Sequence, residues 1–395
     1  MGLFIKKPLA DLMTEANDSG SKSLKRILGP WSLIALGVGV IIGAGLFSIT
    51  GAVAAGYTGP AITLSFAIAA LGCCFAGLCY AEFASMIPVA GSAYTYSYAT
   101  MGELVAWIIG WDLVLEYCVA ATTVSISWSR YLVVFLEGFG VHLPQALTAC
   151  PWDGGIVNIP AFVIVVLMSI LLIRGTEGSS IFNGIIVFLK VSVVLVFVVL
   201  GWKYIRMENY TPYIPANTGT LGEFGFSGIL RGAAIVFFAF LGFDAVSTAA
   251  QETKNPKRNM PIGILMSLVV CTILYMLFAH VMTGVVHYSA FAGQNGIAPV
   301  AIAIDHMGQM DASGVIRPDY PWMNRAIVIA ILLGVLLGYH GNVIRTESCI
   351  LEYEPGWAAP SPILPISMRN SARRHEVISC LCYWSVHWQL SFRRA

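Results

Sequence analysis

The sequence "LGVGVIIGAGLF" (residues 36–47) places four glycines inside a long apolar run that carries no charge between Arg26 and Glu82. These glycines are Gly37, Gly39, Gly43 and Gly45. A glycine in a helix interior costs roughly 1 kcal/mol relative to alanine. The pattern therefore has two interpretations: a neighbouring element packs very closely here, or the helix is interrupted.

The composition is that of a polytopic membrane protein. The chain has 395 residues, of which 57% are hydrophobic and 11% charged, and its mean hydropathy is +0.76. A soluble protein carries roughly 25% charged residues. The net charge of +1 gives no indication of nucleic-acid binding, and the nine cysteines show neither metal nor disulfide spacing. We also find no phosphate loop, zinc spacing or nucleophile elbow, so we expect no cofactor, no metal and no enzyme activity.

Eight segments are apolar and long enough to be membrane-spanning helices, which need about 20 residues. They are approximately 30–56, 61–87, 93–136, 159–174, 180–203, 228–250, 260–283 and 322–340. The third is long, and its opening "SAYTYSYATM" is expected at the membrane interface. The fold class is therefore all-α and polytopic.

Lysine and arginine near the ends of these spans predict the orientation of the chain. The basic residues on the first side are Lys6, Lys7, Lys22, Lys25, Arg26, Arg174, Lys254, Lys257 and Arg258. The other side has fewer, spread over longer loops. We expect the N-terminus to lie in the cytoplasm and the protein to lie in the plasma (inner) membrane.

The sixth span is also interrupted. It reads "GILRGAAIVFFAFLGFDAVSTAAQETKNP" (228–256), in which Gly242 and the acid Asp244 disturb the apolar run. Two broken spans at corresponding positions of two halves are a sequence pointer to a transporter's binding site. Freed N–H groups of the first span suit a carboxylate, and freed carbonyls of the sixth suit an ammonium. The alternative for the first span, a packing pair of Gly39 and Gly43, stays open.

Four stretches carry a resemblance to a known family: "GVGVIIGAGLF", "YAEFASMIPVAGSAYTYSYATMGELVAWIIGWDLVLEY", "RGTEGS" and "FFAFLGFDAVSTAAQETKNPKRNMPIGI". Over about residues 24–339 the chain resembles the amino acid–polyamine–organocation superfamily, and within it the cationic amino acid transporter family. The resemblance implies a fold of two inverted repeats of five helices. It implies that Ile42, Gly43, Ala44 and Gly45 bind a substrate carboxylate. It also implies that Phe238, Ala239 and Leu241 bind the substrate amine.

Lys190 lies about 15 Å along the fifth span, near mid-membrane. A lysine at that depth costs about 2.5–3.5 kcal/mol to insert. One interpretation is an ion pair with Asp112 or Glu116, which share a face of the third span. The other is proton coupling by Lys190 and Glu116, which the resemblance favours because a lysine takes the place of sodium in proton-coupled members. Asp112 and Asp244 are expected to be supporting acids, although Asp244 could instead cap the lower half of the sixth span.

The sequence changes character from about Tyr339. Codons permitted for "RTESCILEYEPGWAAP" (345–360), read one nucleotide later, can encode "GQSRVFLSMSRDGLLP", which resembles the loop that the family carries there. We expect four parts: a cytoplasmic segment 1–29, a first repeat 30–203, a partial second repeat 228–340, and an aberrant tail 341–395. A chain with such a tail would lack helices 9–12 and is expected to be unstable or inactive.

The sequence therefore predicts a secondary active amino acid permease in the lipid bilayer that works by proton symport and alternating access. Its expected partners are a small-molecule amino acid, protons and lipid. Two alternatives remain: an amino acid exchanger, and a truncated product or pseudogene relic that does not transport.

Overall fold

The computed structural model describes Lys6, Pro8 and residues 26–87, 92–151, 154–173, 180–292, 298–310, 316–320 and 322–334. The expected tail 341–395 and most of the N-terminal segment 1–29 lie outside these residues.

The described residues are mostly helical. The α-helices are α2 (Pro30–Ile41), α3 (Thr50–Val53), α4 (Ile62–Met86), α5 (Ser92–Thr100), α6 (Glu103–Glu137), α7 (Ile159–Ile173), α8 (Ser180–Gly201), α9 (Gly225–Val236), α10 (Ala245–Thr248), α11 (Pro256–Val285) and α12 (Pro299–Asp305). A further helix spans Trp322–Gly334. The π-helices are η1 (Gly45–Ile49) and η2 (Ala54–Thr58), and the longer 3₁₀ turns are η7 (Met207–Tyr210), η8 (Phe237–Phe240), η9 (Ala249–Glu252) and η10 (Tyr288–Phe291). Three-residue 3₁₀ turns are η3 (Gly59–Ala61), η4 (Gln145–Leu147) and η6 (Trp202–Tyr204). Strands β1 (Gly308–Met310) and β2 (Ile316–Pro318) pair antiparallel.

Each of the eight predicted spans contains a helix, and α12 (Pro299–Asp305) is a further helix that lies outside them. Within the described residues, five segments are long and apolar enough to cross a membrane: Pro30–Met86, Glu103–Glu137, Val187–Tyr204, Gly225–Glu252 and Pro256–Val285. The first of these holds two predicted spans, separated where Gly59 adopts a positive φ of 60°. Two shorter apolar helices, Ile159–Ile170 and Trp322–Gly334, correspond to the fourth and eighth predicted spans.

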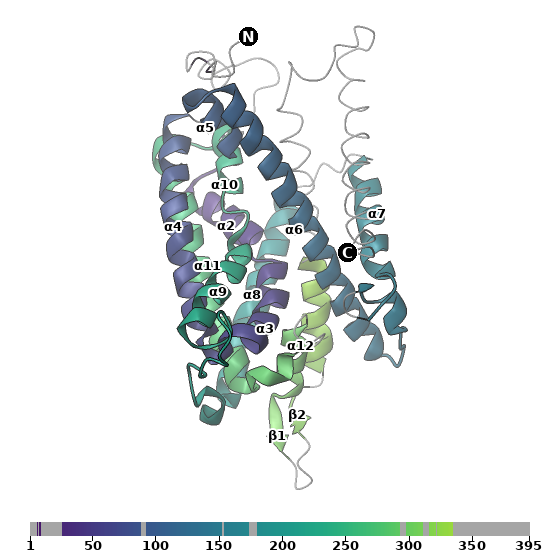
Figure 1. Ribbon diagram of the computed structural model, residues 1–395. Coiled ribbons are helices and arrows are strands. Elements are labelled where there is room, and N and C mark those ends of the chain that lie inside the picture. The colour runs from purple at the N-terminus through teal and green to yellow at the C-terminus, as the bar shows by residue number, and fades with distance from the viewer. Residues whose placement is uncertain are drawn as a thin grey trace.

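The third predicted span consists of two helices. Helix α5 (Ser92–Thr100) is separate from α6 because the chain bends at Gly102, whose φ is 105°. Helix α6 has 35 residues. At 1.5 Å per residue it is about 52 Å long, whereas the hydrocarbon core of a bilayer is about 30 Å thick. In Figure 1 it runs obliquely, as expected for a helix longer than the membrane is thick.

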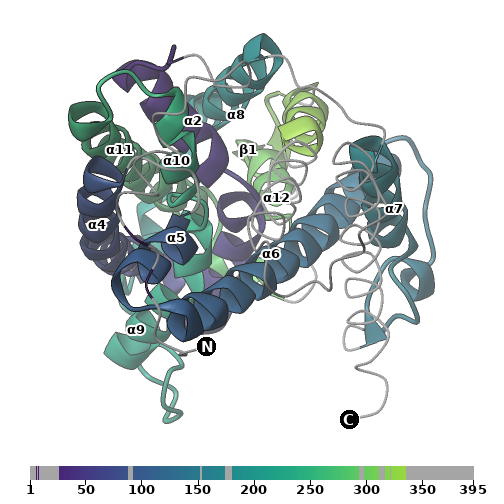
Figure 2. The same cartoon turned by 90° about the horizontal axis from the view of Figure 1, so that it is seen from above.

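Helices α2, α4, α10 and α11 gather on one side of α6, and α7 lies on its other side (Figures 1 and 2). Glycines bring α2 and α11 close together. A Cβ added at Gly37 would lie 2.6 Å from Ser267 Cβ, and one added at Gly263 would lie 2.7 Å from Leu33 Cβ. Small residues at such a contact are the usual means by which membrane helices approach each other.

Large apolar side chains also lie on the outer surface. Trp31, Phe188 and Val199 have 81%, 75% and 69% of their surface exposed. Exposure of this kind is unfavourable in water and suits contact with lipid.

Candidate functional site

The first span is broken at Ile42 and Gly43. Helix α2 ends at Ile41, and Ile42 has extended backbone angles (φ −71°, ψ 108°). Helical structure resumes at Ala44 and continues as the π-helix η1. At the bend, the N–H groups of Leu46 and Phe47 both point to the carbonyl of Gly43, at 3.2 and 3.3 Å. The helix is therefore interrupted, which is one of the two interpretations that the glycines left open.

The sixth span is broken between Phe240 and Ala245. Helix α9 tightens into the 3₁₀ turn η8, Leu241 is extended (ψ 138°), and helix α10 begins at Ala245. Gly242 has a φ of 97°, a conformation that glycine adopts far more readily than other residues. The sequence therefore predicted this second break correctly.

The two breaks meet in space. A Cβ added at Gly45 would lie 2.4 Å from the Cα of Ala239, so the backbones of the first and sixth spans touch at this point. A Cβ added at Gly43 would find no heavy atom within 4 Å. Gly45 is thus a close-packing residue, whereas Gly43 borders open space at the first break.

Close packing explains the remaining glycines of the opening stretch. A Cβ added at Gly39 would lie 2.1 Å from Val187 Cγ2 on α8, and Gly37 is against α11. The expected pairing of Gly39 with Gly43 on one packing face is not found, because Gly43 has no such neighbour. The two interpretations of the sequence are therefore both correct, for different glycines.

Lys190 contacts the first span three residues before its break at Ile42. Its side chain is 3% exposed, and its ammonium donates to the carbonyl of Gly39 at 3.1 Å. The stem of the lysine lies beside the helix Trp322–Gly334, since a Cβ added at Gly334 would be 3.0 Å from Lys190 Cγ. The lysine, on α8, thus contacts both α2 and the helix Trp322–Gly334.

Asp244 is buried, 5% exposed, and ties the sixth span to its neighbours. Its carboxylate accepts from Tyr117 on α6 at 2.8 Å and from Ser92 on α5 at 3.1 Å. The same carboxylate makes no hydrogen bond to the first turn of α10, so a capping role is not what the structure shows. Of the other two acids, Asp112 is exposed and Glu116 is half-buried.

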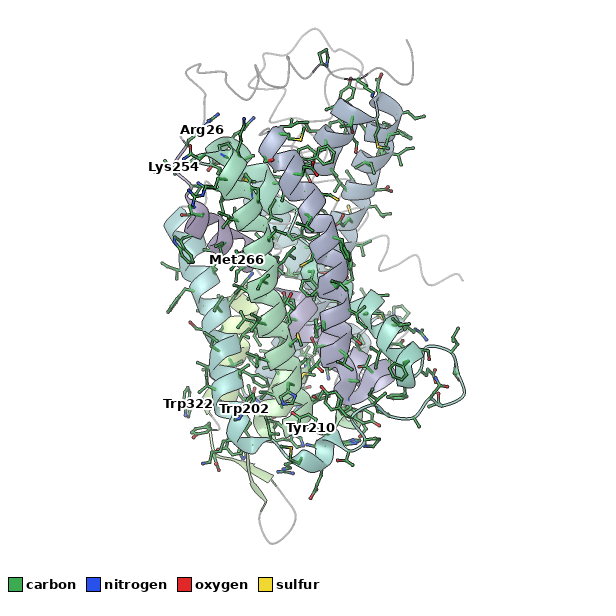
Figure 3. All side chains as sticks on the ribbon, turned by 90° about the vertical axis from the view of Figure 1, so that its left-hand side faces the viewer. Arg26, Trp202, Tyr210, Lys254, Met266 and Trp322 are labelled. Carbon is green, nitrogen blue, oxygen red and sulfur yellow. The ribbon has the colours of Figure 1, made fainter. Side chains whose placement is uncertain are left out.

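The ends of the two broken spans are joined by backbone hydrogen bonds. The N–H groups of Ile27 and Leu28 donate to the carbonyl of Glu252 at 2.9 and 3.0 Å, and Lys254 N–H donates to the carbonyl of Leu28 at 2.9 Å. Figure 3 shows Arg26 and Lys254 together at this end of the molecule. The segment before the first span and the segment after the sixth are therefore held together.

Three polar side chains whose contacts to the broken spans were not predicted from the sequence lie on α6 and α11. The hydroxyl of Tyr131 on α6 donates to the carbonyl of Phe47 at 2.6 Å, and Ser127 bonds to Ser48. Tyr275 on α11 reaches the carbonyls of Ile41 and Ala239. A tyrosine in an apolar span normally indicates packing or interface anchoring, so the sequence held no signal that separated these residues from the other aromatic ones.

Two interrupted helices that meet inside a bundle of apolar helices are typical of many secondary transporters. A family model described as "Amino acid permease" matches residues 28–344, and the chain belongs to this family. The family is one of transporters rather than enzymes, and the protein is an integral membrane protein.

The chain is similar to the branched-chain amino acid permease BcaP of Bacillus subtilis, at 49% identity over 80% of this chain. It is 46% identical to the methylthioribose transporter of the same organism, again over 80% of this chain. It spans 66% of the length of each. The predicted resemblance to cationic amino acid transporters is confirmed by a vacuolar protein of that name from Arabidopsis thaliana, which is 34% identical over 80% of this chain and 52% of its own length.

Among solved structures, a Na⁺-coupled sialic acid symporter in a substrate-bound, outward-open state aligns with a TM-score of 0.55. The alignment covers 98% of this chain and 79% of that one, at 14% identity. This likeness confirms the predicted class of fold, a polytopic helical membrane fold.

Proposed function

We propose that the protein is a secondary amino acid transporter that holds the zwitterionic part of its substrate between the two breaks. The observation that carries this proposal is the contact of Gly45 with Ala239 beside the open space at Gly43. A ligand there would lie against two irregular backbone segments at once. Irregular backbone inside a membrane is tolerated where protein or a cavity satisfies it.

The two segments offer opposite partial charges. The outer half of the first span begins at Ala44, so its positive end faces the break and favours a carboxylate bound by Ile42, Gly43, Ala44 and Gly45. The inner end of α9 and η8 is a helix C-terminus, which presents carbonyl oxygens. Phe238, Ala239 and Leu241 on this end are suited to an ammonium.

The side chain of the substrate is expected to be neutral and apolar. Ile42, Phe238 and Leu241 at the breaks are apolar, and the carboxylate of Asp244 is occupied by Tyr117 and Ser92. The relative of 49% identity is named as a branched-chain amino acid permease. We therefore choose leucine as the probe, with methylthioribose as the competing candidate suggested by the second relative.

Transport is proposed to proceed by alternating access with proton symport. The bundle that contains the first and sixth spans would rock around the fixed site. Lys190 and Glu116 are the proposed proton-coupling residues. The contact of the Lys190 ammonium with Gly39 supports this role, because a change in its charge would act directly on the span that forms the carboxylate side.

The test of the site is Gly43→Val, measured as binding of radiolabelled leucine to the full chain in lipid nanodiscs. The added side chain would project into the open space beside Gly43, where we propose that the substrate carboxylate binds, so we expect binding to fall at least about tenfold while the protein still folds. Gly72→Val is the matched control. Gly72 likewise has no atom within 4 Å of an added Cβ, but it is an exposed residue of α4 and belongs to neither break.

If Gly43→Val binds leucine as tightly as the wild-type protein, the substrate does not bind at the two breaks and the proposed site is wrong. Wild-type protein that binds methylthioribose and no amino acid would overturn the proposed substrate class. Leucine uptake into liposomes that requires internal leucine and ignores a proton gradient would identify an exchanger in place of a symporter.

A further inference from the structure

Tyr275 is a fully buried tyrosine whose hydroxyl lies between the two breaks. It is on α11, with 0% of its surface exposed. The hydroxyl is 2.8 Å from the carbonyl oxygen of Ile41 and 3.0 Å from that of Ala239. Ile41 is the last residue of α2, and Ala239 lies in η8. One side chain of a third helix therefore reaches the broken end of both interrupted spans.

The two carbonyls need such a partner. Carbonyl groups at the end of a helix lack an intrahelical donor, and a buried carbonyl without a donor is costly. A tyrosine hydroxyl has a single proton, so the two carbonyls share one donor. Both oxygens are thereby drawn toward one point, which sets the position of one break relative to the other.

Packing fixes the hydroxyl in place. The ring of Tyr275 lies 5.5 Å from the ring of Phe66 and 5.3 Å from that of Phe240, measured between centroids. Phe66 and Phe240 are themselves 6.4 Å apart, and both are fully buried. A ring held on two sides by other rings cannot change rotamer without disturbing the core. The hydroxyl is thus held in a fixed position between α11, the end of α2 and the turn η8.

We propose that Tyr275 is a positioning residue for the transport site: it sets the separation between the carboxylate-binding and amine-binding breaks. Selectivity for a ligand with both charged ends then depends on this hydroxyl. A ligand with only one charged end uses one break and is insensitive to their separation. This inference rests on the function proposed above. It extends that function to the residue that fixes the distance between the carboxylate-binding break and the amine-binding break.

The test is Tyr275→Phe, which removes the hydroxyl and keeps the ring. Three probes compete with radiolabelled leucine on the full chain in nanodiscs: leucine itself, 4-methylpentanoate, which lacks the amine, and 3-methylbutylamine, which lacks the carboxylate. We expect leucine to bind about tenfold more weakly, as for the loss of a good hydrogen bond, while the two analogues change less than about threefold. The preference for leucine over both analogues should therefore fall.

The matched control is Tyr210→Phe. The hydroxyl of Tyr210 also donates to a backbone carbonyl of α11, that of His280 at 2.7 Å. Tyr210 lies in η7, at the end of the molecule opposite to Arg26 (Figure 3), and its hydroxyl bonds to neither broken span. This variant should keep the wild-type preference for leucine. A second variant, Phe66→Leu, keeps the Tyr275 hydroxyl but removes one ring beside it, and should lower the preference in the same direction.

An equal loss of affinity for all three probes in Tyr275→Phe would assign the tyrosine a purely structural role and overturn the inference, as would unchanged leucine binding. If Tyr275→Phe does not fold, an unchanged preference in Phe66→Leu overturns it and a lowered preference supports it. Wild-type protein that binds no amino acid would instead overturn the proposed function, which is a separate outcome.

Discussion

The role of Lys190 depends on the groups that surround its side chain. Its sequence position predicts a lysine deep in the membrane, where the charge needs a partner. The structure supplies the carbonyl of Gly39, three residues before the break in the first span. A change in the charge of Lys190 would therefore act on the backbone of α2, three residues from the proposed substrate site. Whether it also pairs with Asp112 or Glu116 stays a prediction.

Proton coupling by Lys190 predicts that Lys190→Gln abolishes the pH dependence of leucine uptake. Glutamine can still donate a hydrogen bond to Gly39 but cannot change its charge, so uptake into liposomes should become independent of an imposed proton gradient. Lys203→Gln is the matched control, since Lys203 is exposed and lies just beyond the end of the same helix. Uptake by Lys190→Gln that still follows the gradient would make this lysine structural.

The interrupted helices are the elements on which the proposed function depends, and each is interrupted by a local backbone feature. In the sixth span this feature is Gly242, with its φ of 97°. The halves on either side are held by different neighbours: Ala239 by Tyr275, and Asp244 by Tyr117 and Ser92. The geometry of the break therefore depends on the glycine and on contacts from three other helices.

At this scale we predict that Gly242→Ala weakens leucine binding about tenfold, because a Cβ at positive φ moves the backbone of the break. Strain of this kind also costs on the order of 1–3 kcal/mol of stability. Gly219→Ala is the control, since Gly219 has nearly the same φ, 94°, in the loop before α9, with no atom within 4 Å of an added Cβ. Thermal unfolding should register both substitutions, and leucine binding only the first. Equal binding by both variants would contradict a role for the break.

At the scale of the whole molecule, the distribution of charged and aromatic residues defines two ends. Arg26 and Lys254 lie at one end, and Trp202, Tyr210 and Trp322 at the other (Figure 3). Basic residues favour the cytoplasmic side of a membrane, and tryptophan and tyrosine favour an interface. The hydrogen bonds between Leu28 and the segment Glu252–Lys254 join the first and sixth spans at the basic end. We propose that this end is cytoplasmic.

The orientation predicts the accessibility of inserted epitopes in intact bacterial spheroplasts that express the protein. An epitope inserted at Gly219, in the exposed loop before α9, should bind antibody from outside, and an epitope at the N-terminus should bind only after the membrane is permeabilised. Detection of the N-terminal epitope on intact spheroplasts would reverse the proposed orientation. Permeabilised samples of both insertions serve as the control for expression.

The sequence by itself determined the membrane class, the position of the eight apolar spans, and the two spans that break. These properties follow from local causes: hydropathy sets the spans, and glycines weaken the helix at Gly43 and Gly242. It could not assign Gly43 to open space and Gly45 to close packing, because the two differ only in what another helix places beside them. Only the tertiary structure brought Tyr275 to both breaks and Lys190 to Gly39, since these contacts join residues more than 30 positions apart in the chain.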